Sequence, residues 1–201
     1  MSAIELYVDP ICPFAWVTSR WLLDVAGAAG CDVELRQMSL AVLNEGRDMA
    51  PAQRVKLDWA GRVGRVFAAV ARGGPGSFGE LYEAFGVLVH NEGAELADGT
   101  VKEALAAANL GPALIDALDD PGWDDGVRAA HQRSQDVLGG AGGSPIIAVD
   151  GTGFFGPVLT EVPARDGGIA LLDAVLTAVS TPGFAVLQRP YQGPPSVPGR
   201  R

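Results

Sequence analysis

The chain has 201 residues, of which 48% are hydrophobic and 19% charged, and its formal net charge is -9. This length suits one domain, or one domain with an insertion, that is large enough to bury a core. The negative charge argues against nucleic-acid binding, because phosphates are bound by clusters of Lys and Arg. The sequence contains no apolar run of about 18 residues, the length that is needed to span a bilayer. The first residues, MSAIELYVDP, lack the basic segment and cleavage site of a secretory signal, so we expect a cytoplasmic protein.

The first 40 residues predict a strand, a helix and a second strand. Residues 3–9 (AIELYVD) mix β-branched and aromatic residues, which is typical of a short strand. Apolar residues then recur at helical spacing from Pro13, at the favoured first helical position, towards a stop at Gly30. Residues 32–40 (DVELRQMSL) predict another strand. A strand–helix–strand unit of this length makes a parallel pair of strands.

The middle of the chain predicts only helices. Segments rich in Ala, Leu and Val are separated by turn sequences such as GGPG and DDPG. We expect helices at about 51–72, 77–90, 100–108, 111–119 and 124–138. This block is interpreted as an all-helical insertion.

The last third predicts a hairpin and a closing helix. After a glycine run, SPIIAVDGTGFFG places two apolar stretches around Asp150 and Gly151, which is a hairpin signal. The order β-α-β, helical insertion, β-β-α is that of an α/β thioredoxin fold. We expect a thioredoxin-like domain at 1–50 and 139–189, an all-helical insertion at 51–138, and a Pro/Gly-rich tail at 190–201 that is extended or disordered.

Cys12 is the first candidate for chemistry, because it lies where the first strand turns into the first helix. A thiolate is the reactive form, and the positive end of a helix dipole favours it, so we expect a pKa below the usual value of about 8.5. The alternative is a buried structural cysteine. Cys31 would lie roughly 25 to 30 Å away along the helix, too far for a disulfide. We expect Cys31 to be a core or incidental residue.

Several blocks of sequence, in order, resemble the actinobacterial branch of the DsbA-like proteins that includes the mycothiol-dependent nitroreductases. These blocks are DPICPFAWVTSRWLL, MSLAVLNEGRD, HNEG and GSPIIAVDGTGFFGPVL. The resemblance implies a thioredoxin fold with a helical insertion, a cytoplasmic location and commonly a homodimer. It also makes Cys12 the nucleophile of a CPxC motif and Pro145 a cis-proline, with the backbone of Ser144 exposed to bind substrate.

The chain departs from this family at the second cysteine of the motif. The family motif resembles CPWC, whereas this chain has Cys12, Pro13, Phe14 and Ala15. A methyl group cannot attack sulfur, so cycling between a dithiol and an intramolecular disulfide is excluded.

Two enzymatic readings remain open for a lone cysteine. In the first, Cys12 adds reversibly to a conjugated, carbonyl-activated double bond and isomerises it between E and Z, with no cofactor. The substrate would be a polyene or cinnamoyl-like acyl group, free or bound to a carrier protein. Relatives in the wider superfamily that lack CxxC, the kappa-class glutathione transferases and hydroxychromene carboxylate isomerases, suggest such chemistry.

In the second enzymatic hypothesis, mycothiol or another small thiol resolves the adduct on Cys12. The protein would then be a monothiol reductase of disulfides or nitroaromatics. A non-catalytic binding protein is a third class.

Further residues are candidates for the substrate site. His90 and Asn91 close a predicted helix, and the resemblance suggests that they face the cleft, where His90 could donate to a carbonyl or move a proton. Alternatively His90 only satisfies the last carbonyls of its helix. Asn44 could make a polar contact or cap a helix or turn. The other candidates for substrate binding are Pro13, Phe14, Trp16, Ser144, Pro145 and Phe155.

Other signals argue against further cofactors. The two histidines, two cysteines and acidic residues show no metal-ligand spacing, so we expect no metal site. The glycine runs do not match the patterns of dinucleotide or ATP sites. His131, in the middle of a predicted helix, is expected to be a surface or packing residue.

Overall fold

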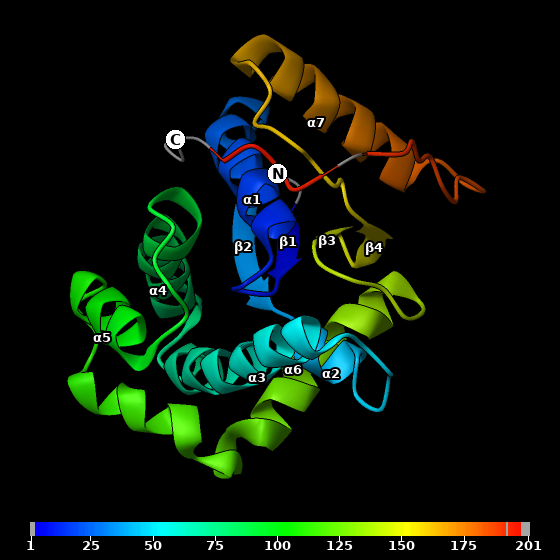
Figure 1. Cartoon of the computed structure of the whole chain (residues 1–201). Helices are drawn as coiled ribbons and strands as arrows, with labels where there is room; N and C mark the ends of the chain where they lie inside the picture. The colour runs from blue at the N-terminus through cyan, green and yellow to red at the C-terminus, as the bar shows by residue number, and fades with distance from the viewer. Residues whose placement is uncertain (1–2, 192, 198–201) are drawn as a thin grey trace.

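The computed structural model describes residues 3–191 and 193–197. Its sheet has the strand order β2-β1-β3-β4. The strands are β1 (Ala3–Val8), β2 (Asp32–Gln37), β3 (Ile146–Val149) and β4 (Thr152–Phe155). β1 is parallel to β2 and antiparallel to β3, which is antiparallel to β4. This is the predicted thioredoxin layout (Figure 1).

Helices cover both faces of the sheet. α1 (Pro13–Val25) and α7 (Arg165–Ser180) lie together on one face, where the indole of Trp21 donates to the carbonyl oxygen of Gly168 at 2.9 Å. A Cβ at Gly168 would lie 3.1 Å from the Trp21 ring, so glycine permits this close approach. α6 (Asp124–Leu138) packs on the opposite face, against Tyr7 and Ile146.

The remaining helical segments lie between α1 and β2, directly after β2, and within residues 51–138, where the insertion is expected. They are α2 (Leu40–Leu43), α3 (Pro51–Ala71), α4 (Pro75–Gly86) and α5 (Asp98–Ala107), with 3-10 turns η1 (Ala26–Ala29), η3 (Pro112–Asp119) and η4 (Pro121–Trp123) and a π-helical turn η2 (Val87–Asn91). No helix within 3–191 and 193–197 is long and apolar enough to cross a membrane.

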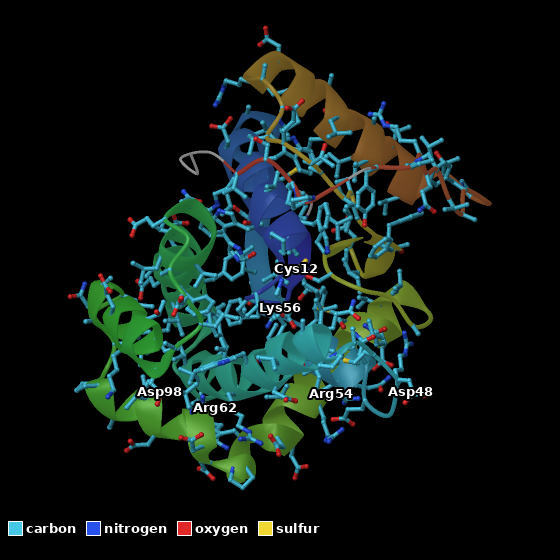
Figure 2. The ribbon with its side chains drawn as sticks, viewed as in Figure 1. Cys12, Asp48, Arg54, Lys56, Arg62 and Asp98 are labelled. Atoms are coloured by element: carbon cyan, nitrogen blue, oxygen red, sulfur yellow. The ribbon has the colours of Figure 1, made fainter. Side chains whose placement is uncertain are left out.

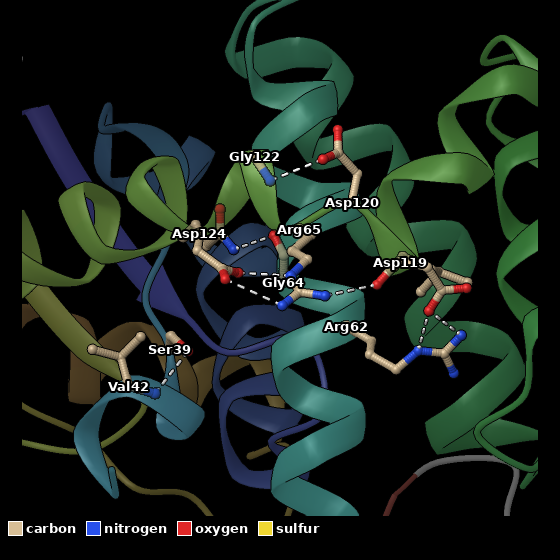
Figure 3. A network of polar contacts seen from close by, with 11 residues as sticks. Ser39, Val42, Arg62, Gly64, Arg65, Asp119, Asp120, Gly122 and Asp124 are labelled. Carbon is tan, nitrogen blue, oxygen red and sulfur yellow. Dashed lines mark hydrogen bonds and ion pairs between the residues drawn. The ribbon is translucent and has the colours of Figure 1, made fainter.

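Polar contacts connect α3 to the rest of the insertion and to the sheet (Figure 3). Arg65 holds Asp124 through two hydrogen bonds of 2.6 and 3.2 Å, and Arg62 Nε donates to Asp119 at 3.0 Å. The amide of Gln37, at the end of β2, donates to the carbonyl oxygen of Gly64 at 2.8 Å. Because Gln37 is buried, this last contact helps to fix α3 against the sheet.

Two local predictions need correction, and one is confirmed. The second strand does not continue to residue 40: it ends at Gln37, and the Ser39 hydroxyl accepts from the amide of Val42, so it caps α2. The helix expected at 111–119 is a 3-10 helix. The hairpin is confirmed, since Asp150 and Gly151 have φ of 48° and 83°, both positive as in a type I′ turn.

Candidate active site around Cys12

Two segments that are distant in the sequence meet at Cys12. It is the N-cap residue of α1, with extended backbone, and lies at the start of that helix (Figure 2). Its carbonyl oxygen accepts the first helical hydrogen bond from the amide of Trp16 at 3.1 Å. Its thiol donates to the carbonyl oxygen of Ser144 at 3.5 Å, and the Ser144–Pro145 peptide bond is cis. The start of the first helix and the loop before β3 therefore meet at the sulfur.

The expectation of a lowered Cys12 pKa is wrong for this state. Burial raises the pKa of the Cys12 thiol to about 11, and the charge of Asp9 contributes in the same direction. The amide groups of Ala15 and Phe14, together with the contact to Ser144, oppose this rise. Only 5% of Cys12 is exposed, so the loss of hydration outweighs the favourable helix terminus. As described, the site holds a neutral thiol.

Asp9 is a site residue that the sequence reasoning missed. It is 1% exposed, and its two carboxylate oxygens accept from the amides of Ile11, at 3.0 Å, and Leu40, at 2.6 Å. The Asp9 amide in turn donates to the hydroxyl of Ser144 at 2.9 Å. Burial raises the pKa of Asp9 to about 6, although the two amide donors lower it by stabilising the carboxylate. The available signal was an acidic residue directly after a buried strand and three residues before the cysteine.

His90, Trp16 and Asn91 form a second buried group beside the active-site turn. His90 Nε2 lies 3.0 Å from the carbonyl oxygen of Pro10, so this nitrogen carries the proton in that contact. The His90 ring stacks on Trp16, with 5.7 Å between ring centres, and the Trp16 indole donates to Asn91 Oδ1 at 2.7 Å. The π-helical turn η2 thus places both predicted residues against the turn that carries Cys12.

The other predicted residues are less closely grouped. Phe14 is half-buried and meets Tyr191 edge to face. Phe155 is 54% exposed on β4, and a Cβ built on Gly143, in the loop before the cis bond, would lie 3.5 Å from its ring. Asn44 donates to the carbonyl oxygen of Leu40 at 2.8 Å, so its observed contact is that of a helix cap.

Both cysteines are free, and neither forms a redox pair within the described chain. Ala15 occupies the position of a resolving cysteine and is fully buried, while Cys31 lies buried beyond the far end of α1. His131 is buried rather than exposed, and its Nδ1 accepts from the amide of Ser39 at 3.5 Å. Among the residues described, no group of three His, Cys, Asp or Glu side chains could hold a metal ion.

Comparison with known families agrees with this geometry. A sequence model of the Rv2466c-like family, described as mycothiol-dependent nitroreductase Rv2466c, matches residues 11–189. The chain belongs to the Rv2466c-like family. Cys12 and the cis-proline loop both lie within the matched region, whereas Tyr191 and the residues after it do not.

Similar proteins extend this family and fold assignment. An uncharacterized protein, Rv2286c, from Mycobacterium tuberculosis is 34% identical over 194 residues, which are 94% of this chain and 83% of that protein. The cytosolic disulfide reductase DsbM from Pseudomonas aeruginosa, solved with GSH, has a TM-score of 0.57 and 15% identity, covering 87% of this chain and 99% of its own. A 2-hydroxychromene-2-carboxylate isomerase has a TM-score of 0.54 and 14% identity, covering 87% and 94%. At such identities these structures show a shared DsbA-like thioredoxin fold.

Proposed function

We propose that this protein is a cysteine-dependent E/Z isomerase of a conjugated, carbonyl-activated double bond. The observation that carries the proposal is the lone Cys12 thiol at the N-terminus of α1, opposite the cis bond before Pro145, with Ala15 where a second thiol would stand. A reaction that begins and ends with the same free thiol is consistent with this arrangement. Dithiol exchange is not, because nothing in the turn can displace an adduct.

The reaction balances without a second reagent. The sulfur of Cys12 forms a C–S bond to the β-carbon, the π electrons move to the carbonyl, and the thiol proton passes to the carbonyl oxygen as the enol forms. Rotation about the former double bond follows. The enol then returns its electrons to the carbon–carbon bond, the C–S bond breaks, and the proton returns to sulfur. No oxidant, reductant or cofactor is consumed.

The surrounding residues support roles in this cycle. The Ser144 carbonyl orients the thiol, and the aromatic ring of Phe14 offers a surface for a flat conjugated substrate. His90, held by Pro10 and stacked on Trp16, positions the indole that borders the turn. The substrate would be a small or carrier-bound unsaturated acyl compound, and the shared fold of the hydroxychromene carboxylate isomerase is compatible with double-bond chemistry.

A second candidate is a mycothiol-dependent monothiol oxidoreductase, which the family match favours. Here Cys12 forms a mixed disulfide with a substrate or with mycothiol, and a second mycothiol thiolate attacks that bond and releases Cys12. This cycle oxidises two mycothiol molecules for each disulfide reduced, so it can be distinguished by the consumption of thiol.

The test offers pure E and pure Z isomers of a cinnamoyl thioester to the protein in thiol-free buffer, followed by chromatography. We expect both isomers to reach the same final ratio, with at least about 100-fold loss of rate in Cys12→Ser and a change below about twofold in the control Cys31→Ser. Turnover that requires mycothiol and consumes it would favour the second candidate and overturn the first. Full turnover by Cys12→Ser would overturn both.

A further inference from the structure

The chain returns to the active-site turn after its last helix. Beyond α7, residues 181–191 and 193–197 form neither helix nor strand, and they cross back over α1 (Figure 1). We call residues 181–191 and 193–197 the strap. Within the strap, the ring of Tyr191 meets Phe14 edge to face, with 5.0 Å between ring centres and 61° between ring planes. Phe14 lies in the first turn of α1, which begins directly after Cys12, so the strap contacts the helix turn that carries the nucleophile.

Contacts on both sides of Tyr191 hold the strap in place. Before it, the ring of Phe184 lies 5.7 Å from that of Phe154 on β4. After it, the amide of Ser196 donates to the carbonyl oxygen of Thr160 at 2.6 Å, and Val197 is buried in the main hydrophobic core. These anchors make the path over α1 a specific one.

The stretch between the anchors is held weakly. Leu187 is 89% exposed and Tyr191 is 52% exposed, so little apolar area is buried there. Segments with few buried contacts open at low free energy, whereas the sheet and the buried stack of Trp16 and His90 do not. Because Cys12 is nearly inaccessible in the described state, some element must move before a substrate carbon can reach the sulfur.

We propose that the strap is a movable wall of the Cys12 site, and that Tyr191, with Phe14, forms the aromatic surface that selects flat, conjugated substrates. The opening of the wall is inferred from the contact between Tyr191 and Phe14 and from the burial of Cys12. The selection of substrate rests in addition on the proposed function. The match to the family ends at residue 189, so Tyr191, Ser196 and Val197 lie outside the matched region. The family model therefore does not describe the contact between Tyr191 and Phe14.

Opening of the strap also has a consequence for the nucleophile. Burial is the largest cause of the high pKa of Cys12, while the amides of Ala15 and Phe14 favour the thiolate. If water or a polar substrate group reaches the sulfur when the strap lifts, burial no longer disfavours the thiolate as strongly. The amides of Ala15 and Phe14 still favour it, so the pKa of Cys12 falls. Access and activation of Cys12 are thereby coupled.

Alkylation of Cys12 tests the wall without any substrate. Iodoacetamide and a bulky aromatic maleimide are reacted with the full-length protein, in the Cys31→Ser background, and modification of Cys12 is followed by mass spectrometry. Tyr191→Ala and Val197→Asp, which detach the strap at different points, are expected to accelerate the maleimide reaction at least about tenfold and the iodoacetamide reaction less. The control Leu23→Ala, an exposed apolar residue of α1, is expected to react like the parent. Equal rates in the parent and both strap variants would overturn the wall.

Substrate kinetics test the selection step separately. With the cinnamoyl thioester, Tyr191→Ala is expected to raise KM about fivefold with a smaller change in kcat, and Tyr191→Phe is expected to restore KM. Faster alkylation with no isomerase activity in any variant would overturn the proposed function and leave the wall standing. Isomerase activity with an unchanged KM in Tyr191→Ala would overturn the selective role of Tyr191.

Discussion

The Cys12 thiol donates to the carbonyl oxygen of Ser144 at 3.5 Å, on the N-terminal side of the cis bond to Pro145. This contact brings together the two parts of the site, the helix start that carries the nucleophile and the loop that faces it. A protonated thiol fits this contact, since a thiolate cannot donate and burial raises the pKa of Cys12 to about 11.

The first prediction concerns the reactivity of Cys12 as a function of pH. Since burial raises its pKa to about 11, the thiolate fraction in the closed protein increases with pH up to and beyond pH 10. We expect the rate of Cys12 alkylation by iodoacetamide to rise by about tenfold per pH unit between pH 7 and pH 10. Cys12 modification is measured by mass spectrometry in Cys31→Ser protein. A plateau above pH 8 would instead support the lowered pKa that the helix terminus alone suggests.

The second prediction concerns stability and Asp9. Burial raises the pKa of Asp9 from 3.8 to about 6 in the folded protein, so the folded state binds the proton more tightly than the unfolded state. This contribution to stability is complete below about pH 4 and is lost as pH rises through about 6, with a total of about 3 kcal/mol. We expect the difference in unfolding free energy between the wild type and Asp9→Asn to change by that amount between pH 4 and pH 7.

Urea unfolding at several pH values measures this effect. Asp166→Asn, in the first turn of α7, serves as the control because Asp166 is exposed. A stability difference between wild type and Asp9→Asn that stays constant from pH 4 to pH 7 would contradict the raised pKa.

The third prediction concerns Gly86, which makes room for Trp16. A Cβ at Gly86 would lie 2.1 Å from Cζ3 of the fully buried Trp16 ring, so that ring or α4 must shift. Although alanine is normally better than glycine in a helix by about 1 kcal/mol, we expect Gly86→Ala to destabilise the protein by about 1 to 3 kcal/mol. Gly79→Ala, in the same helix with no atom near its Cβ position, is the matched control and should be neutral or stabilising. Thermal unfolding of both variants decides the point.

The fourth prediction concerns the hydrogen bond from Trp16 to Asn91. Asn91→Leu would leave the buried indole N–H without this acceptor, at a cost of about 1 to 3 kcal/mol in unfolding free energy. Asn91→Asp keeps an oxygen in place and is expected to lose less. Chemical denaturation compares the three proteins. Equal losses of unfolding free energy in Asn91→Leu and Asn91→Asp would contradict this prediction, because the oxygen at position 91 would then make no difference to the indole.

Much of the fold could be predicted because it follows from local pattern. The helix at 124–138 was predicted with its observed bounds, since a DDPG turn precedes it and Gly139 ends it with a φ of 76°. The hairpin at Asp150 and Gly151 was predicted for the same reason, as both positions need positive φ. Strand β2 was extended too far, because the apolar alternation in residues 32–40 does not show that Ser39 caps α2.

The site was predicted less completely, because burial is a property of the whole fold. A helix terminus alone suggests an acidic thiol, yet the packed surroundings of Cys12 reverse the direction of the pKa shift. Asp9 was missed because its partners, the amide of Leu40 and the hydroxyl of Ser144, come from distant segments. Phe14 and Tyr191 are 177 positions apart in the sequence, so no local pattern predicts the contact between their rings.

The sequence by itself determined the order of the elements, the position of Cys12 at a helix start and the loss of a resolving thiol at Ala15. These features depend on residue type and on neighbours within a few positions. Only the tertiary structure decided the protonation of the sulfur, the partners of Asp9 and the return of the C-terminal strap to α1. Each of these depends on which distant groups exclude water from one atom, and that is settled only when the chain has packed.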